Sequence, residues 1–395
     1  MAHIRLERTI WPVGHGAFYT EQFKDENNHV LFTAVYDCGS EQEKALEKCI
    51  KEFLPEKEQL IIDALFISHF HDDHVNKLNY LLQKNVSVRN LFIPQLTDDY
   101  VLSILATNTT NGRRGTANNS LLEQLYKRQK VDHIETIYEV PQINSDYVHE
   151  GEYRGIDNAK YKYQAAQFTF ADPRIPFWVY VPCNIFVPSD SLKQEFIKSG
   201  YGDQANNEVD VDLVFDALKN GLWKDIQDIY KKAFPKGHNE YSMTVYSGFA
   251  QNVRLHCEES DINYHVSAYH QNSCSLYYPY CIEDLLYRDA GCLYTGDFEA
   301  KNHGQKLIQF YTQNFNLWDK VQMMQIPHHG SFKDNYYKGL YDYRKLTFAS
   351  TAANDKYGHP HVQTLANIST MGCPIVVVQD NKATTLITMY EITTI

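Results

Sequence analysis

The sequence predicts an α/β fold, and two observations support this prediction. Residues 62–68 (IDALFIS) form an apolar run of the length expected for a central strand that is buried on both faces. A helical pattern at 75–84 and a further strand pattern at 87–94 follow it. Strand, helix and strand at this spacing are typical of α/β architectures. With 395 residues, of which 43% are hydrophobic, the chain can bury a sizeable core.

Strand-like and helical patterns continue on both sides of this unit. Before it, we predict strands at 4–10, 15–23 and 30–40 and a helix at 41–53. After it, the predicted elements are a polar loop at 107–120, a strand at 177–187, a helix at 211–234, and strands at 241–249, 291–298, 321–331, 346–351 and 374–380.

Composition restricts the functional classes. The formal charge is −12 and the pI about 5.8, which argues against broad electrostatic capture of nucleic acid. A nucleic-acid substrate is still compatible with this charge, because bound cations can locally reverse the sign of a site. The N-terminal residues lack the apolar core of a signal peptide, and no apolar run approaches the ~18 residues of a membrane helix. The eight cysteines form no C-x-x-C pair and are expected to be buried free thiols, which favours a cytoplasmic location.

Residues 67–74 (ISHFHDDH) predict a metal site. His69 and His71 are two positions apart, so in an extended segment both side chains leave the same face. Asp73 and His74 follow where the strand gives way to a helix. Imidazole and carboxylate ligands suit zinc, and also manganese or iron. The alternative is a run of polar residues on an exposed turn, which four ligand-type side chains in six positions after a buried strand disfavour.

The H-x-H-x-D-H pattern after a hydrophobic strand resembles the signature of the metallo-β-lactamase-fold hydrolases. Three further motifs resemble the same family in the expected order: CLYTGD (292–297), QIPHHGS (325–331) and NDKYGHP (354–360). The last two are particularly similar to the metallo-β-lactamase domain of the DNA-uptake competence proteins of the ComEC type. The resemblance implies an αββα sandwich formed by one domain over 1–395. The long interval between His74 and Asp297 then implies an insertion at about 97–235, which would form a lid, a substrate platform or an interface.

The resemblance also implies roles for individual residues. His69 and His71 would hold one divalent metal, Asp73 and His74 a second, and Asp297 would bridge them. His329 would be a further ligand, with His328 as the alternative. The histidine before the T-G-D strand would be His238 or, less favoured, His270, and Asn239 and Ser242 lie near the same position. Asp37 would orient a metal-bound histidine or, alternatively, form a turn. His359 would contact the substrate or donate a proton to the leaving group, or be a loop histidine without a role. His3, His15, His29 and His361 are given no role.

The implied chemistry is metal-dependent hydrolysis. Two divalent ions, zinc or manganese, would lower the pKa of a shared water so that hydroxide, oriented by Asp73, exists near neutral pH. The motif resemblance favours a phosphodiesterase or nuclease with a nucleotide or nucleic-acid substrate. Tyrosine-rich segments that include Lys and Arg could stack bases, although ordinary packing explains them equally well. The alternatives are an ester, thioester or lactone hydrolase with the same ligands, and a metal-stabilised subunit that binds a protein partner.

Overall fold

The computed structural model describes most of the chain. The described residues are 2–55, 59–110, 116–143, 151–154, 160–163, 168–186, 188–235, 242–250, 290–332 and 336–394. His238, Asn239 and His270 lie outside these ranges.

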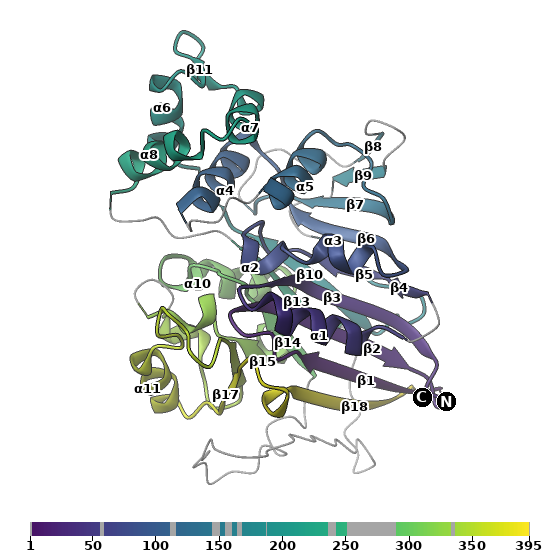
Figure 1. Cartoon of the computed structure of the whole chain (residues 1–395). Helices are drawn as coiled ribbons and strands as arrows, with labels where there is room; N and C mark the ends of the chain where they lie inside the picture. The colour runs from purple at the N-terminus through teal and green to yellow at the C-terminus, as the bar shows by residue number, and fades with distance from the viewer. Residues whose placement is uncertain are drawn as a thin grey trace.

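A first, ten-stranded sheet forms one half of the molecule. Its strands are β1 (Ala2–Ile10), β2 (Gly16–Lys24), β3 (Val30–Ser40), β4 (Leu60–Ile62), β5 (Ala64–Phe66), β6 (Val86–Pro94), β7 (Ile134–Val140), β8 (Gly151–Arg154), β9 (Lys160–Tyr163) and β18 (Leu386–Thr394). The order is β18-β1-β2-β3-β5-β6-β7-β9-β8, and β4 also pairs with β6. Because β1 pairs with β18, the two ends of the chain lie side by side (Figure 1).

A second, six-stranded sheet packs against the first. It contains, in this order, β10 (Trp178–Asn184), β13 (Met243–Phe249), β14 (Gly291–Tyr294), β15 (Val321–Gln325), β16 (Leu346–Ser350) and β17 (Ile375–Val378). A separate pair is formed by β11 (Gly202–Asp203) and β12 (Glu208–Val209).

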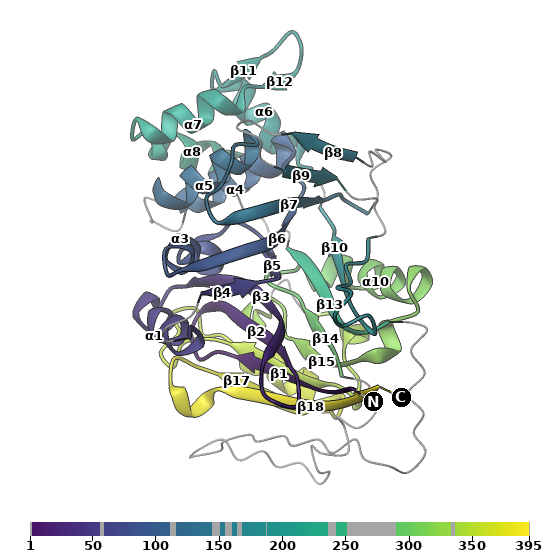
Figure 2. The same ribbon diagram turned by 90° about the vertical axis from the view of Figure 1, so that its right-hand side faces the viewer.

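Helices cover the outer faces of both sheets (Figures 1 and 2). The first sheet is accompanied by α1 (Glu43–Phe53), α2 (Asp72–Val75), α3 (Leu78–Leu82), α4 (Asp98–Thr110), α5 (Thr116–Tyr126), α6 (Asp190–Lys198), α7 (Val211–Lys219) and α8 (Trp223–Ala233). The second sheet is accompanied by α10 (Ala300–Gln309) and α11 (Val362–Thr370).

Three layers of buried apolar side chains hold these elements together. The first lies between the helices and the outer face of the first sheet, and includes Leu46 of α1 with Leu65 of β5. The second lies between the two sheets, where Phe32 stacks on Tyr180 with ring centroids 5.8 Å apart. The third lies under α10 and α11. The fold is therefore an αββα sandwich, and the predicted fold class is confirmed.

The range 97–235, which is predicted to contain an insertion, contributes strands to both sheets. Strands β7 and β9 extend the first sheet beyond β6, and β10 forms one edge of the second sheet. The helices of the same range form a lobe at one end of the sandwich (Figures 1 and 2).

Two helical segments differ from the predictions for physical reasons. The segment 107–120 was expected to be a polar loop, but Thr107 to Thr110 belong to α4 and Thr116 to Ser120 to α5. The threonine hydroxyls donate to carbonyl groups of the helix itself, Thr107 to Ser103 O at 2.9 Å for example, which satisfies them inside the helix. The predicted single helix at 211–234 is divided into α7 and α8 at Gly221, which has φ +80°.

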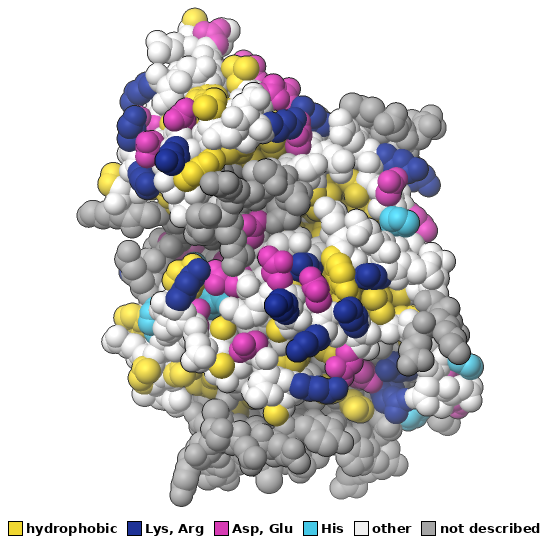
Figure 3. Space-filling model, viewed as in Figure 1, with side chains coloured by type: hydrophobic (Ala, Val, Ile, Leu, Met, Phe, Trp, Pro, Cys, Tyr) yellow, Lys and Arg dark blue, Asp and Glu magenta, His cyan; other side chains and the backbone are white. Residues whose placement is uncertain are grey.

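The exposed surface is mixed in charge. On the face drawn in Figure 3, Lys and Arg side chains alternate with Asp and Glu. Charged side chains also pair where they are partly buried: Lys77 lies 2.7 Å from both Glu43 and Glu47. In the described part of the chain, no helix is long and apolar enough to cross a membrane. The five cysteines within the described ranges are buried and unpaired, as expected.

Candidate metal centre

The predicted site residues meet where the parallel strands of both sheets end. In the first sheet, β3 and β5 run parallel, and the segment from Ser68 to His74 follows β5. In the second sheet, β14, β15 and β16 run parallel; Asp297 follows β14 and His329 follows β15. Carboxyl ends of parallel strands lie at one edge of a sheet, and ligands of α/β proteins bind at such edges. Packing the two sheets together therefore brings both sets of polar side chains into one site.

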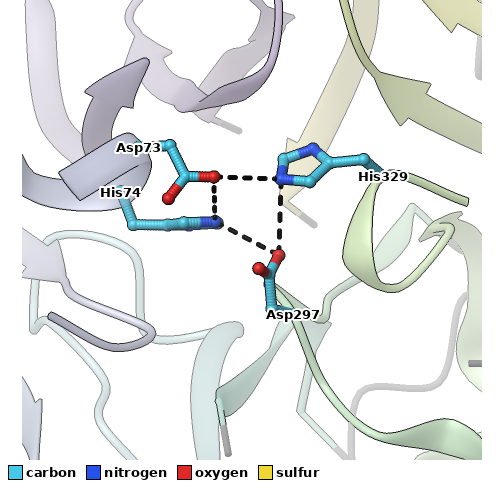
Figure 4. Close-up of side chains that lie close together, drawn as sticks. All are labelled: Asp73, His74, Asp297 and His329. Atoms are coloured by element: carbon cyan, nitrogen blue, oxygen red, sulfur yellow. Dashed lines mark ion pairs between the residues drawn. The ribbon is translucent and has the colours of Figure 1, made fainter. Parts of the chain in front are cut away.

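Four of these side chains form a first donor group: Asp73, His74, Asp297 and His329 (Figure 4). His74 Nε2 lies 3.2 Å from Asp297 Oδ1 and 3.7 Å from Asp73 Oδ2. His329 Nε2 lies 3.4 Å from Asp73 Oδ2 and 3.5 Å from Asp297 Oδ1. The four side chains thus point toward one common position.

A second donor group consists of His69, His71 and Asp297. His69 Nε2 lies 3.8 Å from Asp297 Oδ2, and the rings of His69 and His71 are 4.4 Å apart at 88°. Asp297 therefore offers one oxygen to each group, which is the position that the sequence analysis assigned to a bridging ligand.

The donor sets fit divalent metal ions. A tetrahedral ion about 2.1 Å from its ligands places them about 3.4 Å from one another, close to the 3.2–3.7 Å of the four His–Asp contacts in the first group. The Nε2 atoms of His69, His74 and His329 are buried and have no hydrogen-bond partner among the described residues. Burying such atoms without partners is costly, and a bound cation would remove that cost.

The opposite ring nitrogens are held by hydrogen bonds. His74 Nδ1 lies 2.7 Å from Asp37 Oδ2, and Asp37 also accepts hydrogen bonds from the Ser68 amide and hydroxyl. His329 Nδ1 lies 2.8 Å from the carbonyl oxygen of Ser350. Such partners fix the ring orientation and leave Nε2 as the metal-binding atom.

Ser242 connects the two sheets within the site. Its Oγ lies 3.0 Å from His69 Nδ1 and accepts a hydrogen bond from the Asp297 amide at 2.8 Å. In the sequence, only a motif connects Ser242 with this region, whereas in the structure Ser242 contacts two donor residues. His238 and Asn239, predicted near the same position, and His270 lie outside the described residues.

The turn after β15 decides which of two adjacent histidines faces the centre. His328, His329 and Gly330 all have positive φ angles, +48°, +54° and +85°. Such angles are unfavourable for residues with a Cβ, and they commonly occur at functional sites. His329 is buried and belongs to the first group, while His328 is 25% exposed and its Nε2 lies 3.9 Å from Asp297 Oδ2.

Electrostatics keep the carboxylates ionised. Burial raises the pKa of Asp73, but His74 and His329 lower it well below its usual value. Burial likewise raises the pKa of Asp297, and His328, His74 and His329 lower it well below the usual value. Burial lowers the pKa of His74, but Asp297, Asp73 and Asp37 raise it well above the ordinary value. With this raised pKa, His74 would hold a proton when no metal ion is bound. The carboxylates would favour a metal cation in place of the His74 proton, so metal binding would release that proton.

His359 lies beside the centre, outside both donor groups. Its ring centroid is 6.0 Å from that of His328 and 6.5 Å from that of His329. Burial, with the neighbouring histidines, lowers the pKa of His359 to about 3. Its imidazole is therefore neutral at neutral pH, which disfavours proton donation and leaves it able to bind a cation.

Two residues near the centre were missed in the sequence analysis. His15, which was given no role, lies with its ring 3.9 Å from that of His329 and its Nε2 3.7 Å from Asp73 Oδ2. Asp355 Oδ1 lies 3.0 Å from His15 Nδ1. Two features of the sequence could have indicated these residues. His15 stands between two glycines ahead of a strand, and Asp355 lies inside the NDKYGHP motif.

The fold and the His/Asp cluster define an αββα protein with a candidate binuclear metal centre at the carboxyl edge of its sheets. Among solved structures, the chain is similar to the metallo-β-lactamase fold protein YhfI from Bacillus subtilis, with 7% identity and a TM-score of 0.39 over 98% of this chain and 99% of that one. It is also similar to a long form RNase Z from yeast, with 9% identity and a TM-score of 0.32 over 88% of this chain and 36% of that one. Unliganded yeast PDE1 is 10% identical, with a TM-score of 0.35 over 99% and 100% of the two chains. No family model and no curated protein matches the chain.

Proposed function

We propose that the chain is a metal-dependent hydrolase that cleaves phosphodiesters. The observation that supports the proposal is the pair of His/Asp donor groups that share Asp297 in a buried site. Sites with two adjacent divalent cations activate water and neutralise charge on the oxygens of an attacked phosphorus. We propose phosphodiesters and not carbonyl compounds as substrates because the PHHGS and YGHP motifs resemble the ComEC-type domain.

Asp73 would be the donor that substrate and water meet first. Its side chain is 16% exposed, whereas those of His74, Asp297 and His329 are 0%, 5% and 0% exposed. Oδ2 of this ionised carboxylate also faces His15, His74 and His329. It can accept a hydrogen bond from an attacking water and orient that water in line with the leaving group.

His328 would contact the substrate. It is more exposed than the neighbouring donors, and its Nε2 lies 3.9 Å from Asp297 Oδ2. An imidazole at the mouth of the site can donate a hydrogen bond to an oxygen of an anionic substrate. His328 would thereby position the reacting group over the shared carboxylate.

The test is hydrolysis of bis-p-nitrophenyl phosphate by the purified chain with zinc or manganese. We expect turnover that falls at least 100-fold in Asp297→Asn and in Asp73→Asn, because each change removes a carboxylate from the donor set. Asp319→Asn is the control, since Asp319 is 79% exposed and pairs only loosely with Arg344, at 3.9 Å.

The substrate class is tested in the same assay with p-nitrophenyl acetate and a thioester. Turnover of phosphodiester alone supports the proposal. Turnover of the ester or thioester alone, or equal phosphodiester turnover in wild type and both site variants, contradicts it. Bound metal without hydrolysis of any substrate would instead support a metal-stabilised binding protein.

A further inference from the structure

A third cluster of metal-ligand side chains lies beside the paired groups. His15 precedes β2, and Asp355 and His359 follow β16, so the cluster joins the first sheet to the second. Their ligand atoms all lie within 4.8 Å of one another. His15 Nδ1 is 3.0 Å from Asp355 Oδ1, and His359 Nδ1 is 3.8 Å from Asp355 Oδ2.

The ring nitrogens that face this cluster are buried, and each lies near the carboxylate of Asp355. The side chains of His15, Asp355 and His359 are 6%, 3% and 8% exposed. Nδ1 of His15 and Nδ1 of His359 make no hydrogen bond of good geometry within the described chain. A cation bound by both nitrogens and the carboxylate would satisfy these nitrogens better than the contacts with Asp355 alone.

Backbone contacts hold the cluster in place. The His15 amide donates to Gln42 Oε1 at 2.7 Å, and its carbonyl accepts from the Glu41 amide at 2.8 Å. The His359 amide donates to Asp355 Oδ2 at 2.6 Å, and its carbonyl accepts from Thr351 Oγ1 at 2.9 Å. The donors are therefore positioned before any ion binds, which lowers the cost of binding.

We propose that His15, Asp355 and His359 form a third divalent-cation site next to the paired centre. Two imidazoles and one carboxylate suit zinc, with further positions open to water or substrate. The other nitrogen of His15 faces Asp73 Oδ2 at 3.7 Å, so this imidazole would lie between the third ion and the paired centre. The added positive charge would strengthen attraction of an anionic substrate. The site itself does not depend on which substrate is cleaved.

The experiment measures bound metal. The full-length protein is stripped with chelator, reloaded with zinc, dialysed and analysed for metal per chain, and cobalt spectra are recorded in parallel. Wild type is expected to bind three equivalents. Asp355→Asn and His359→Gln are each expected to bind two, and Asp297→Asn to keep the ion at the third site.

Asp25→Asn is a matched control. Asp25 accepts hydrogen bonds from the amides of Asn27 and His29 and pairs with His29 Nδ1 at 3.0 Å. Asp355 likewise accepts hydrogen bonds from the amides of Tyr357 and His359. The contacts of Asp25, however, lie on the exposed surface. It is expected to bind three equivalents. Thermal unfolding of the metal-free proteins checks that each variant is folded.

Two equivalents in wild type, or three in Asp355→Asn and His359→Gln, would overturn the proposal. Loss of more than one equivalent from a folded Asp355→Asn would also overturn it, because Asp355 would then belong to the paired centre. These outcomes are independent of whether the protein hydrolyses phosphodiesters.

Discussion

At the scale of single residues, the centre depends on partners behind the metal-facing atoms. Asp37 has φ +56°, an unfavourable angle for aspartate, and it is fully buried. Three hydrogen bonds, two from Ser68 and one with His74 Nδ1, hold it there. The strained backbone and the buried charge are thus retained at a position whose main contact is a predicted ligand.

Asp37→Asn is expected to weaken zinc binding 10- to 100-fold, because an amide cannot hold the His74 ring with the same charge and hydrogen bonding. Competition with a chromophoric chelator measures the affinity.

Asp63→Asn serves as the comparison for Asp37→Asn. Asp63 is also buried and accepts the Thr33 amide, but its ion pairs are with Arg89 and Arg174 and it touches none of the donor residues. Its replacement is expected to lower stability and leave zinc affinity unchanged. Equal affinity in wild type and Asp37→Asn would exclude this role for Asp37.

At the scale of elements, the close approach of β3 to α2 places Asp73 and His74. A Cβ on Gly39 would lie 2.3 Å from the carbonyl carbon of His74 and 2.4 Å from its amide nitrogen. The end of β3 therefore touches the backbone of α2 directly, and only glycine fits there.

Gly39→Ala is expected to displace α2 and to reduce zinc affinity at least 10-fold while the sheets remain folded. Gly221→Ala is the control, because Gly221 separates α7 from α8 and no heavy atom lies within 4 Å of its added Cβ. Its φ of +80° makes about 1 kcal/mol of lost stability the expected effect there. Unchanged zinc affinity in Gly39→Ala would show that α2 can move without disturbing the centre.

At the scale of the whole molecule, a buried polar cluster ties the two sheets together. Glu21 on β2 accepts hydrogen bonds from Tyr180, Ser247 and Tyr294 of the second sheet, at 2.7–2.8 Å. It also pairs with Arg8 at 2.6 Å, and both side chains are almost completely buried.

Glu21→Gln is expected to lower the free energy of unfolding by about 3–5 kcal/mol, because Arg8 would remain buried without its counter-charge. Denaturant titration of the metal-free protein measures this. Glu7→Gln, which breaks the partly exposed pair with Lys24, is expected to change stability by no more than about 1 kcal/mol. Similar losses of unfolding free energy in both variants would show that the inter-sheet cluster contributes no more to stability than a surface ion pair does.

The sequence by itself predicted an α/β fold, most strands, and the polar residues at their carboxyl ends, and the resemblance of its motifs to a known family implied the αββα class. Strand β3 matches its prediction at both ends, Val30 and Ser40, because buried strands have a distinct local pattern. ISHFHDDH supplied four donor residues because they are adjacent in the chain. Only the tertiary structure brought His15 to Asp355 and Ser242 to His69, because these contacts form when two separate sheets pack together. Local periodicity shows which side chains are buried, but not which distant side chains they meet.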